Sequence, residues 1–269
     1  MSNAVFITGA CKGTGYRIAE VFASNGWDVI ITGRNGAEAE KSAKILSETY
    51  SVFAKGYECN IRNEQQIIDI FNDIDNAGVF VETVVLCAAD LGFGTDPAKG
   101  MDFFSVPVEE FTRVFETNLV WNFTIVRQAA LRMKDKGKGS IVFLSSNTAY
   151  RAIPNRSAYC ASKGGINSMS KAFAIDLGRY GIRSNVVLPG TIKTQRWEAM
   201  GSKQIINGTL APIGDISDFD DIANAVWFLG TDASKNITGT EITVDGGMSA
   251  QLFPEKLSYL AKKELEEQQ

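Results

Sequence analysis

The sequence contains no histidine among its 269 residues. This absence excludes serine–histidine and cysteine–histidine catalytic triads, zinc sites with histidine ligands and facial-triad iron sites. Acid–base chemistry near neutral pH would have to come from a lysine, tyrosine, cysteine or carboxylate whose pKa is shifted. The chain is therefore either an enzyme that works without imidazole or not an enzyme.

Cysteine is also scarce, and Cys11, Cys59, Cys87 and Cys160 form no CxxC pair. In a chain of this length, such scattered cysteines predict buried, reduced thiols rather than disulfides or a metal site. We therefore expect no bound metal.

Strong charge and long apolar runs are missing as well. The formal net charge of −4 gives no basic excess for binding nucleic acid or an anionic membrane. No apolar run approaches the roughly 20 residues that a membrane-spanning helix needs. Residues 1–10 lack the basic start of a signal peptide and are expected to form a strand. These features predict a cytoplasmic protein that binds neither nucleic acid nor membrane.

Short apolar segments alternate with segments of helical periodicity, and 45% of the residues are hydrophobic. This pattern predicts a single α/β domain at 1–250 with a doubly wound, seven-stranded parallel sheet and helices on both faces. Its strands are expected at 5–8, 29–32, 52–59, 84–88, 141–144, 184–188 and 242–244. Helices are expected at 16–25, 37–49, 108–117, 119–136, 157–180 and 222–229, with one more capped by Asn63.

Two segments interrupt this alternation, at about 90–106 and 191–217, and both follow strands. Ligands of doubly wound sheets bind beyond the carboxyl ends of the strands. We therefore expect these two segments to be substrate loops.

A glycine-rich loop follows the first strand, with Gly9, Gly13 and Gly15 leading into a helix and Thr14 between the last two. Glycines at this spacing allow a tight turn, and the helix N-terminus offers free N–H groups to a diphosphate. This loop resembles the TGxxxGxG fingerprint of the short-chain dehydrogenase/reductase family, and the resemblance extends from Phe6 to Met248. It implies a Rossmann fold with strand order 3-2-1-4-5-6-7 and a nicotinamide cofactor.

Tyr159 and Lys163 are four residues apart in a predicted helix and therefore share one face. The pKa of a phenol is ordinarily about 10, so a fall of roughly 2–3 pH units is needed before it can act as a base near neutrality. An ammonium about 4 Å away supplies roughly 4 kcal/mol at an effective dielectric near 20, which is enough.

The family resemblance adds two residues to this pair. Ser146, thirteen residues before Tyr159, matches the family's catalytic serine, with Ser145 as the runner-up. Asn118 matches the asparagine that holds a water bound to the lysine. The resemblance implies that Ser146 orients the substrate oxygen, Tyr159 transfers a proton, and Lys163 lowers the tyrosine pKa and holds the nicotinamide ribose.

The end of the second strand indicates which cofactor is used. NAD sites usually carry an acidic residue there to hold the ribose 2′-OH, but this chain has Gly33 followed by Arg34. With Lys12 in the glycine loop as a further cation, the sequence favours NADP(H), and NAD(H) remains an alternative. The resemblance implies further cofactor contacts at Asn60, Ile61, Ala88, Pro189, Gly190, Ile192 and Thr194.

The segment after the fourth strand departs from the family pattern. Residues 87–90 are Cys-Ala-Ala-Asp, where the family has Asn-Asn-Ala-Gly. Asp90 is either a loop cap or a polar selector for a hydroxyl-bearing substrate. An apolar wall for a polycyclic alcohol is the competing view of the pocket, and a sugar alcohol would suit Asp90 better. Besides Ser146 and Asp90, the candidate substrate residues are Phe93 and Trp197, and Met101, Phe103, Phe104 and Met200 are further wall candidates.

The extension at 251–269 continues beyond the family's usual end. Leu257, Leu260, Ala261 and Leu265 recur at helical spacing, so the segment is either a disordered tail or a helix that packs on a neighbouring subunit. The resemblance implies a homodimer or homotetramer with helix 157–180 in one interface.

The sequence therefore predicts an oxidoreductase that transfers a hydride between NADP(H) and a secondary alcohol or ketone, with a hydroxysteroid-like or polyol-like substrate. One alternative is an NAD(H)-preferring alcohol dehydrogenase. The other is a catalytically silent dinucleotide-binding redox sensor, which the presence of both Tyr159 and Lys163 disfavours.

Overall fold

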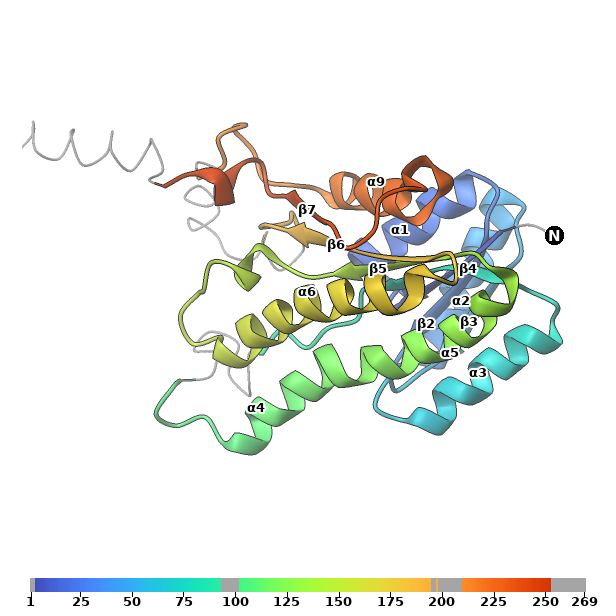
Figure 1. Cartoon of the computed structure of the whole chain (residues 1–269), viewed down its shortest axis with the longest axis horizontal. Helices are drawn as coiled ribbons and strands as arrows, with labels where there is room; N and C mark the ends of the chain where they lie inside the picture. The colour runs from blue at the N-terminus through green and yellow to red at the C-terminus, as the bar shows by residue number, and fades with distance from the viewer. Residues whose placement is uncertain (1–2, 93–101, 195–196, 198–209, 253–269) are drawn as a thin grey trace, which may run out of the picture.

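A computed structural model describes residues 3–92, 102–194, 197 and 210–252. Within these residues, seven parallel strands form one sheet in the order β3-β2-β1-β4-β5-β6-β7, which confirms the predicted doubly wound topology (Figure 1). The strands are β1 (Ala4–Thr8), β2 (Asp28–Gly33), β3 (Ala54–Glu58), β4 (Val81–Leu86), β5 (Gly139–Leu144), β6 (Ile182–Pro189) and β7 (Glu241–Val244).

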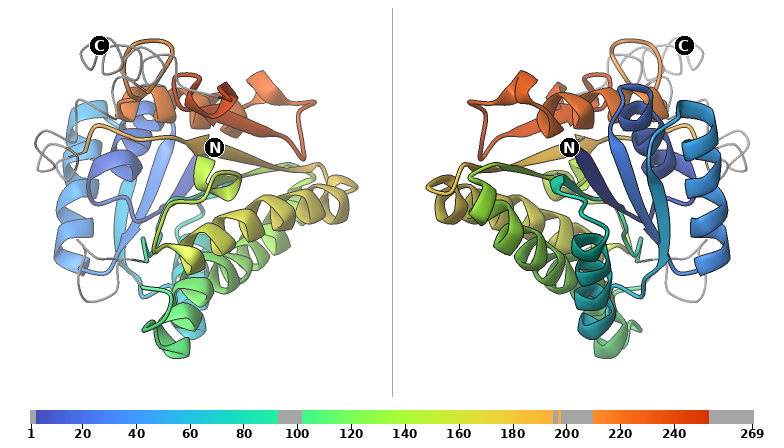
Figure 2. Two further views of the ribbon diagram at one scale, coloured as in Figure 1. Left: turned by 90° about the vertical axis from the view of Figure 1, so that its left-hand side faces the viewer. Right: turned by 90° about the vertical axis from the view of Figure 1, so that its right-hand side faces the viewer.

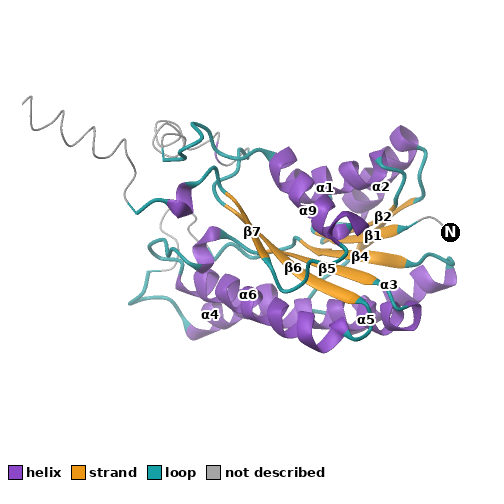
Figure 3. Cartoon of the chain, turned by 45° about the horizontal axis from the view of Figure 1, so that its top comes forward, coloured by secondary structure: helices purple, strands orange, loops and turns teal. Residues whose placement is uncertain are grey.

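Helices cover both faces of the sheet, as Figure 3 shows, and Figure 2 gives the same layers from two opposite sides of the molecule. One layer consists of α1 (Gly13–Ser24), α2 (Gly36–Tyr50) and α9 (Phe219–Gly230). The other consists of α3 (Glu64–Asn76), α4 (Val108–Phe115), α5 (Trp121–Lys136) and α6 (Ser157–Gly178).

The core has two halves because the sheet separates two apolar clusters. On the α1 side, Phe22 packs edge-on against Trp27 and Trp227. On the α3 side, the rings of Phe6 and Phe71 stack at 4.9 Å. The strands β1, β4 and β5 are buried at every position, which explains the apolar runs at 84–86 and 141–144 in the sequence.

The predicted element types are correct, and their ends shift by a few residues. Asn63 caps α3 as predicted, its side chain accepting the Gln66 N–H at 3.1 Å. The break expected between 108–117 and 119–136 is a π-helical segment, η1 (Glu116–Val120), that joins α4 to α5. Such a segment adds a residue to the helix and turns Asn118 into the protein, where it is 1% exposed.

Short 3₁₀ turns complete the described elements: η2 (Asn147–Ala149), η3 (Asp232–Ser234) and η4 (Met248–Ala250). None of the helices in the described ranges is long and apolar enough to cross a membrane. The predicted helix in the 251–269 extension lies outside the described residues, as do Phe93, Met101 and Met200.

Candidate active site

The carboxyl ends of β1 and β4 form the centre of the site. The strand order reverses between these two strands, and ligands of doubly wound sheets bind at this point. Thr8 at the end of β1 joins them, since its Oγ1 accepts the N–H groups of Cys87 and Ala88, both at 3.0 Å.

The glycine loop is built so that backbone alone faces this crevice. Gly9 has a φ of +66°, and a Cβ there would lie 3.0 Å from the Ala88 Cα. A Cβ on Gly15 would lie 2.6 Å from the Gly9 carbonyl oxygen, so helix α1 can start this close to β1 only with glycine. At Lys12, the N-cap of α1, no side chain caps the helix within the described part of the chain. The first N–H groups of α1 are therefore available to an anion, and this cradle fits the diphosphate of a dinucleotide.

A groove of about 700 Å³ runs from this crevice across the ends of β2 and β3. Of the predicted cofactor residues, Gly9, Arg34, Asn60, Ile61 and Ala88 line the groove. Lys12 is not among its lining residues in the described chain and is exposed. Sequence reasoning missed Cys59, Arg62 and Arg113, which also line it.

Three arginines therefore reach the groove, and they differ in their partners. Arg62 is paired with Glu116 at 2.8 Å. Arg113 is paired with Asp90 and, at 2.7 Å, with Glu110. Arg34 forms no ion pair within the described residues, so its charge is available to a phosphate.

The predicted catalytic residues come together at the ends of β5 and α6. Tyr159 and Lys163 lie on α6, and Ser146, which follows β5, lies close enough to the Tyr159 side chain to act on its pKa. The Oγ of Ser145 donates to the Lys163 backbone carbonyl at 3.0 Å, so this runner-up serine is engaged away from the tyrosine hydroxyl.

The pKa of Tyr159 differs from the sequence expectation. Burial raises it to about 12, and the nearby Ser146 hydroxyl only partly opposes this rise. The Lys163 Nζ donates to the Leu144 carbonyl at 2.7 Å and lies 5.6 Å from the centre of the Tyr159 ring. Burial lowers the pKa of Lys163 to about 8. The expectation that Lys163 lowers the tyrosine pKa is therefore wrong for this geometry, because the ammonium is directed at β5.

Asn118 makes its hydrogen bonds to protein atoms. Its side chain binds the backbone N–H and carbonyl of Asp90 at 2.6 and 2.8 Å, and it donates to the Ser162 Oγ at 3.0 Å. Ser162 Oγ in turn donates to the Tyr159 carbonyl at 2.8 Å. Asn118 thus connects the loop after β4 to the helix that carries the tyrosine, and its role toward a water stays a prediction.

Asp90 acts as a loop cap, one of the two roles considered for it. Its Oδ1 accepts the Gly92 N–H at 2.9 Å, and its Oδ2 accepts from the Arg113 guanidinium. Both carboxylate oxygens are therefore engaged within the protein, and a substrate hydroxyl would have to compete with Arg113.

The loop after β6 runs beside the end of β7, and its predicted cofactor residues are not among those that line the groove in the described chain. A Cβ on Gly190 would lie 2.5 Å from the Asp245 Cβ, so only glycine allows Pro189 and Gly190 to run this close to the end of β7. Ile192 forms a parallel bridge with Ser217.

Four other predicted site residues bond within the protein or face solvent. The Thr194 Oγ1 accepts the N–H of Trp197, which is half-buried, at 3.2 Å. Phe103 and Phe104 are 74% and 94% exposed, and their rings pack edge-on against each other. The expectation that they form a pocket wall is wrong for the described residues, because these rings point into solvent.

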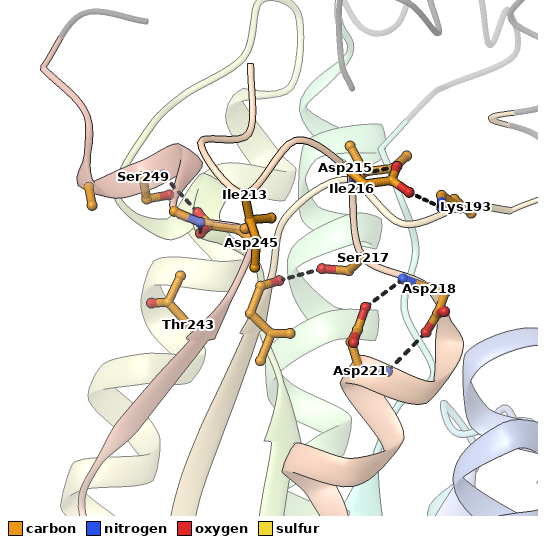
Figure 4. Close-up of a pocket in the computed structure, with 14 residues that line it drawn as sticks. Lys193, Ile213, Asp215, Ile216, Ser217, Asp218, Asp221, Thr243, Asp245 and Ser249 are labelled. Atoms are coloured by element: carbon orange, nitrogen blue, oxygen red, sulfur yellow. Dashed lines mark hydrogen bonds and ion pairs between the residues drawn. The ribbon is translucent and has the colours of Figure 1, made fainter. Parts of the chain in front are cut away.

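Beyond the end of β7 lies a second hollow of about 810 Å³ (Figure 4). Its acidic side chains serve the protein itself: Asp215 pairs with Lys193, and Asp218 and Asp221 form a capping box at the start of α9. Asp245 accepts the backbone N–H groups of Gly247 and Ser249. In the described ranges, no group of His, Cys, Asp and Glu side chains is arranged to hold a metal ion.

All four cysteines are free thiols, but the expectation that they are buried holds only for Cys59. Cys11, Cys87 and Cys160 are half-buried, and Cys87 both packs against the core cluster on the α1 side and lines the groove.

A parallel sheet of this order, with a glycine cradle at the point where the order reverses, defines a dinucleotide-binding Rossmann protein. Residues 9–249 match the family model described as enoyl-(acyl carrier protein) reductase. The chain therefore belongs to the short-chain dehydrogenase/reductase family of oxidoreductases.

Known relatives carry two kinds of activity. The chain is 31% identical over 245 residues to a 3-oxoacyl-[acyl-carrier-protein] reductase of Rickettsia felis, a match covering 90% of this chain and 95% of the relative. It is 35% identical over 250 residues to an NADP-dependent (R)-specific alcohol dehydrogenase of Lentilactobacillus kefiri, covering 91% and 96%. Its structure resembles that of a 3-oxoacyl-[acyl-carrier protein] reductase from Brucella melitensis with bound NAD, at a TM-score of 0.83 and 26% identity, covering 92% and 91% of the chains.

Proposed function

We propose that the protein transfers a hydride between NADP(H) and a ketone or secondary alcohol. The observation that carries the proposal is that Ser146 lies beside Tyr159 after β5, with the Lys163 Nζ 2.7 Å from the Leu144 carbonyl and 5.6 Å from the centre of the Tyr159 ring. Two hydroxyl groups held together in this way can both bind one substrate oxygen.

Each residue of the cluster then has a task in ketone reduction. With a pKa of about 12, Tyr159 keeps its proton at neutral pH and can donate it to the carbonyl oxygen as negative charge develops there. Ser146 donates a second hydrogen bond to the same oxygen. Lys163 holds a positive charge below its pKa of about 8, and its ammonium can donate hydrogen bonds to the nicotinamide ribose as well as to the Leu144 carbonyl. The nicotinamide, when bound, supplies or accepts the hydride.

Two features of the groove support NADP(H) over NAD(H). The end of β2 carries Gly33 rather than a carboxylate, and the adjacent Arg34 lines the groove without an ion-pair partner in the described chain. A guanidinium about 4 Å from a 2′-phosphate contributes on the order of 1–4 kcal/mol, depending on the effective dielectric.

A 3-oxoacyl thioester is a second candidate substrate class. The similarity to the Rickettsia felis reductase, which covers 90% of this chain, favours it. A β-keto thioester presents the same reacting carbonyl as a simple ketone, so the catalytic roles are unchanged.

We further propose that the protein is a homodimer or homotetramer that associates through α5 and α6. Phe123, Leu131 and Ile175 on these helices are 46%, 56% and 82% exposed, which is unusual for large apolar side chains gathered on two adjacent helices. Molar mass measured by light scattering should exceed the 29.3 kDa of one chain at least twofold.

A single screen tests the function. Purified protein is assayed at 340 nm with NADPH and with NADH against cyclic ketones, a steroid ketone, keto sugars and acetoacetyl thioesters. We expect turnover of at least one class with NADPH and a lower kcat/KM with NADH. Tight cofactor binding without turnover of any class would reject the proposal and favour a cofactor sensor, and a higher kcat/KM with NADH would reject the cofactor assignment.

A further inference from the structure

Cys11 of the glycine loop lies directly over Gly33, the last residue of β2. A Cβ built on Gly33 would lie 2.2 Å from the Cys11 Sγ, far closer than non-bonded atoms approach. The same Cβ would lie 3.7 Å from the Cys11 Cβ, which is an ordinary van der Waals separation. The sulfur alone therefore fills the space that a side chain at residue 33 would need.

Hydrogen bonds on both sides hold the two backbones in place. The Cys11 carbonyl accepts the Ser42 hydroxyl of α2 at 3.0 Å. The Gly33 carbonyl accepts the Cys59 N–H at 2.8 Å. The Ala10 N–H donates to the Thr32 carbonyl at 3.1 Å and ties the glycine loop to β2 just beside the contact. A larger residue 33 must therefore turn the sulfur away or pull the glycine loop from the sheet.

The contact lies where the cofactor is selected. Gly33 lines the groove next to Arg34. Dinucleotide-binding folds that prefer NAD present a carboxylate from the end of this strand to the ribose 2′-OH. The same carboxylate would repel the 2′-phosphate of NADP, so excluding it acts against the wrong cofactor.

We propose that Cys11 is a specificity-determining residue. Its sulfur occupies the space that a side chain at residue 33 would need, and it thereby prevents a carboxylate at that position from reaching the groove. The inference rests on the proposed use of NADP(H). A carboxylate at residue 33 is then accommodated only when Cys11 is also replaced, so a substitution at residue 33 alone does not reverse the cofactor preference.

The steric part is tested without cofactor, by thermal unfolding of Gly33→Ala, Cys11→Ala and the double variant. We expect Gly33→Ala to lower the Tm by about 3–10 °C, as overpacking does in other proteins. The Tm of the double variant should lie within about 2 °C of the Tm of Cys11→Ala alone. Gly178→Ala serves as the control, because a Cβ there would meet nothing within 4 Å. It should leave the Tm unchanged both in the wild type and in Cys11→Ala. A Gly33→Ala variant as stable as the wild type, or a double variant whose losses simply add, overturns the inference.

The functional part is tested by calorimetric titration of Gly33→Asp and Cys11→Ala/Gly33→Asp with NADPH and NADH. We expect the single variant to bind both cofactors poorly and the double variant to shift the NADH-to-NADPH affinity ratio by about 100-fold or more relative to wild type. If the single variant shifts the ratio as far as the double variant, the coupling is refuted. A wild-type preference for NADH would reject the proposed cofactor instead, and the unfolding data would still show separately whether Cys11 and Gly33 are coupled.

Discussion

Asn118 holds Asp90 at both polar atoms of its backbone, with Oδ1 accepting the N–H at 2.6 Å and Nδ2 donating to the carbonyl at 2.8 Å. The Asp90 side chain is held from the same helical segment, because Arg113 of α4 pairs with its carboxylate. Glu110, one turn earlier, pairs with Arg113 and fixes its position. The loop after β4, which lacks the two amides of the family pattern, is thus fastened from α4 and η1.

Arg113→Gln should therefore disturb the site more than the fold. The pair with Asp90 is partly exposed, so its loss should lower the Tm by only a few degrees, about 3 °C or less. The loop at Ala88–Asp90 lines the groove, and its displacement should lower kcat/KM about tenfold, or ~1.4 kcal/mol. The control is Lys55→Gln, which removes a partly exposed pair between Lys55 of β3 and Asp73 of α3, neither of which lines the groove in the described chain. An equal loss of kcat/KM in both variants would contradict the positioning role of Arg113.

Tyr159→Phe should remove the proton donor and leave the shape of the site intact. We expect kcat to fall on the order of 10²–10⁴-fold, since general acid catalysis contributes about this much. Calorimetric titration should show NADPH affinity within about threefold of wild type, or less than ~0.7 kcal/mol. Tyr150→Phe is the matched control, because this tyrosine lies close by in the chain, is 66% exposed and bonds to Glu241 instead. A Tyr159→Phe enzyme with wild-type kcat would refute the assignment.

The sheet and the catalytic cluster could be predicted from the sequence because both depend on local signals. Apolar runs such as that of β5 and the cap at Asn63 are encoded by consecutive residues. Likewise, Tyr159 and Lys163 lie on one helix face by spacing alone. Ser146, by contrast, was predicted from its match to the family's catalytic serine thirteen residues before Tyr159.

The parts that sequence reasoning missed depend on contacts between distant segments. The pairing of Arg113 with Asp90 joins α4 to the loop after β4, and no periodicity encodes it. The direction of the Lys163 ammonium depends on a free carbonyl at Leu144, which only the packing of α6 on β5 reveals. For the same reason, the spacing of Tyr159 and Lys163 predicts their proximity but not the pKa of the tyrosine.

The buried ammonium of Lys163 makes activity and stability respond oppositely to pH. Its pKa is lowered to about 8 in the folded protein. The charged form needed for catalysis is lost above this value, so kcat/KM for ketone reduction should be flat below about pH 8 and fall above it. In the same range the unfolded chain, with a lysine pKa near 10.4, binds more protons than the folded one. This residue's contribution to stability should therefore rise with pH.

Lys163→Met isolates the stability effect. Urea unfolding from pH 7 to pH 10 should show the wild type gaining stability relative to the variant between about pH 8 and pH 10. The range stops at pH 10 because Tyr159, whose folded pKa is raised to about 12, acts in the opposite direction above that. A wild-type kcat/KM that stays level to pH 9.5, or a stability difference that shrinks with pH, would contradict the assignment.

Arg34 and Lys12 should contribute unequally to NADPH binding, although the sequence suggests both. Arg34 lines the groove and has no ion-pair partner in the described chain, whereas Lys12 lies at the exposed N-cap of α1 and is not among the lining residues there. Arg34→Gln should weaken NADPH binding by about 10- to 100-fold, corresponding to roughly 1.4–2.7 kcal/mol, and leave NADH binding nearly unchanged. Lys12→Gln should weaken both cofactors by less than about threefold, because a solvated charge acts on the diphosphate only at a distance. Titration of each variant with both cofactors at 0.1 M salt measures these ratios. If Lys12→Gln weakens NADPH binding more than Arg34→Gln does, the 2′-phosphate lies toward the glycine loop rather than at the end of β2.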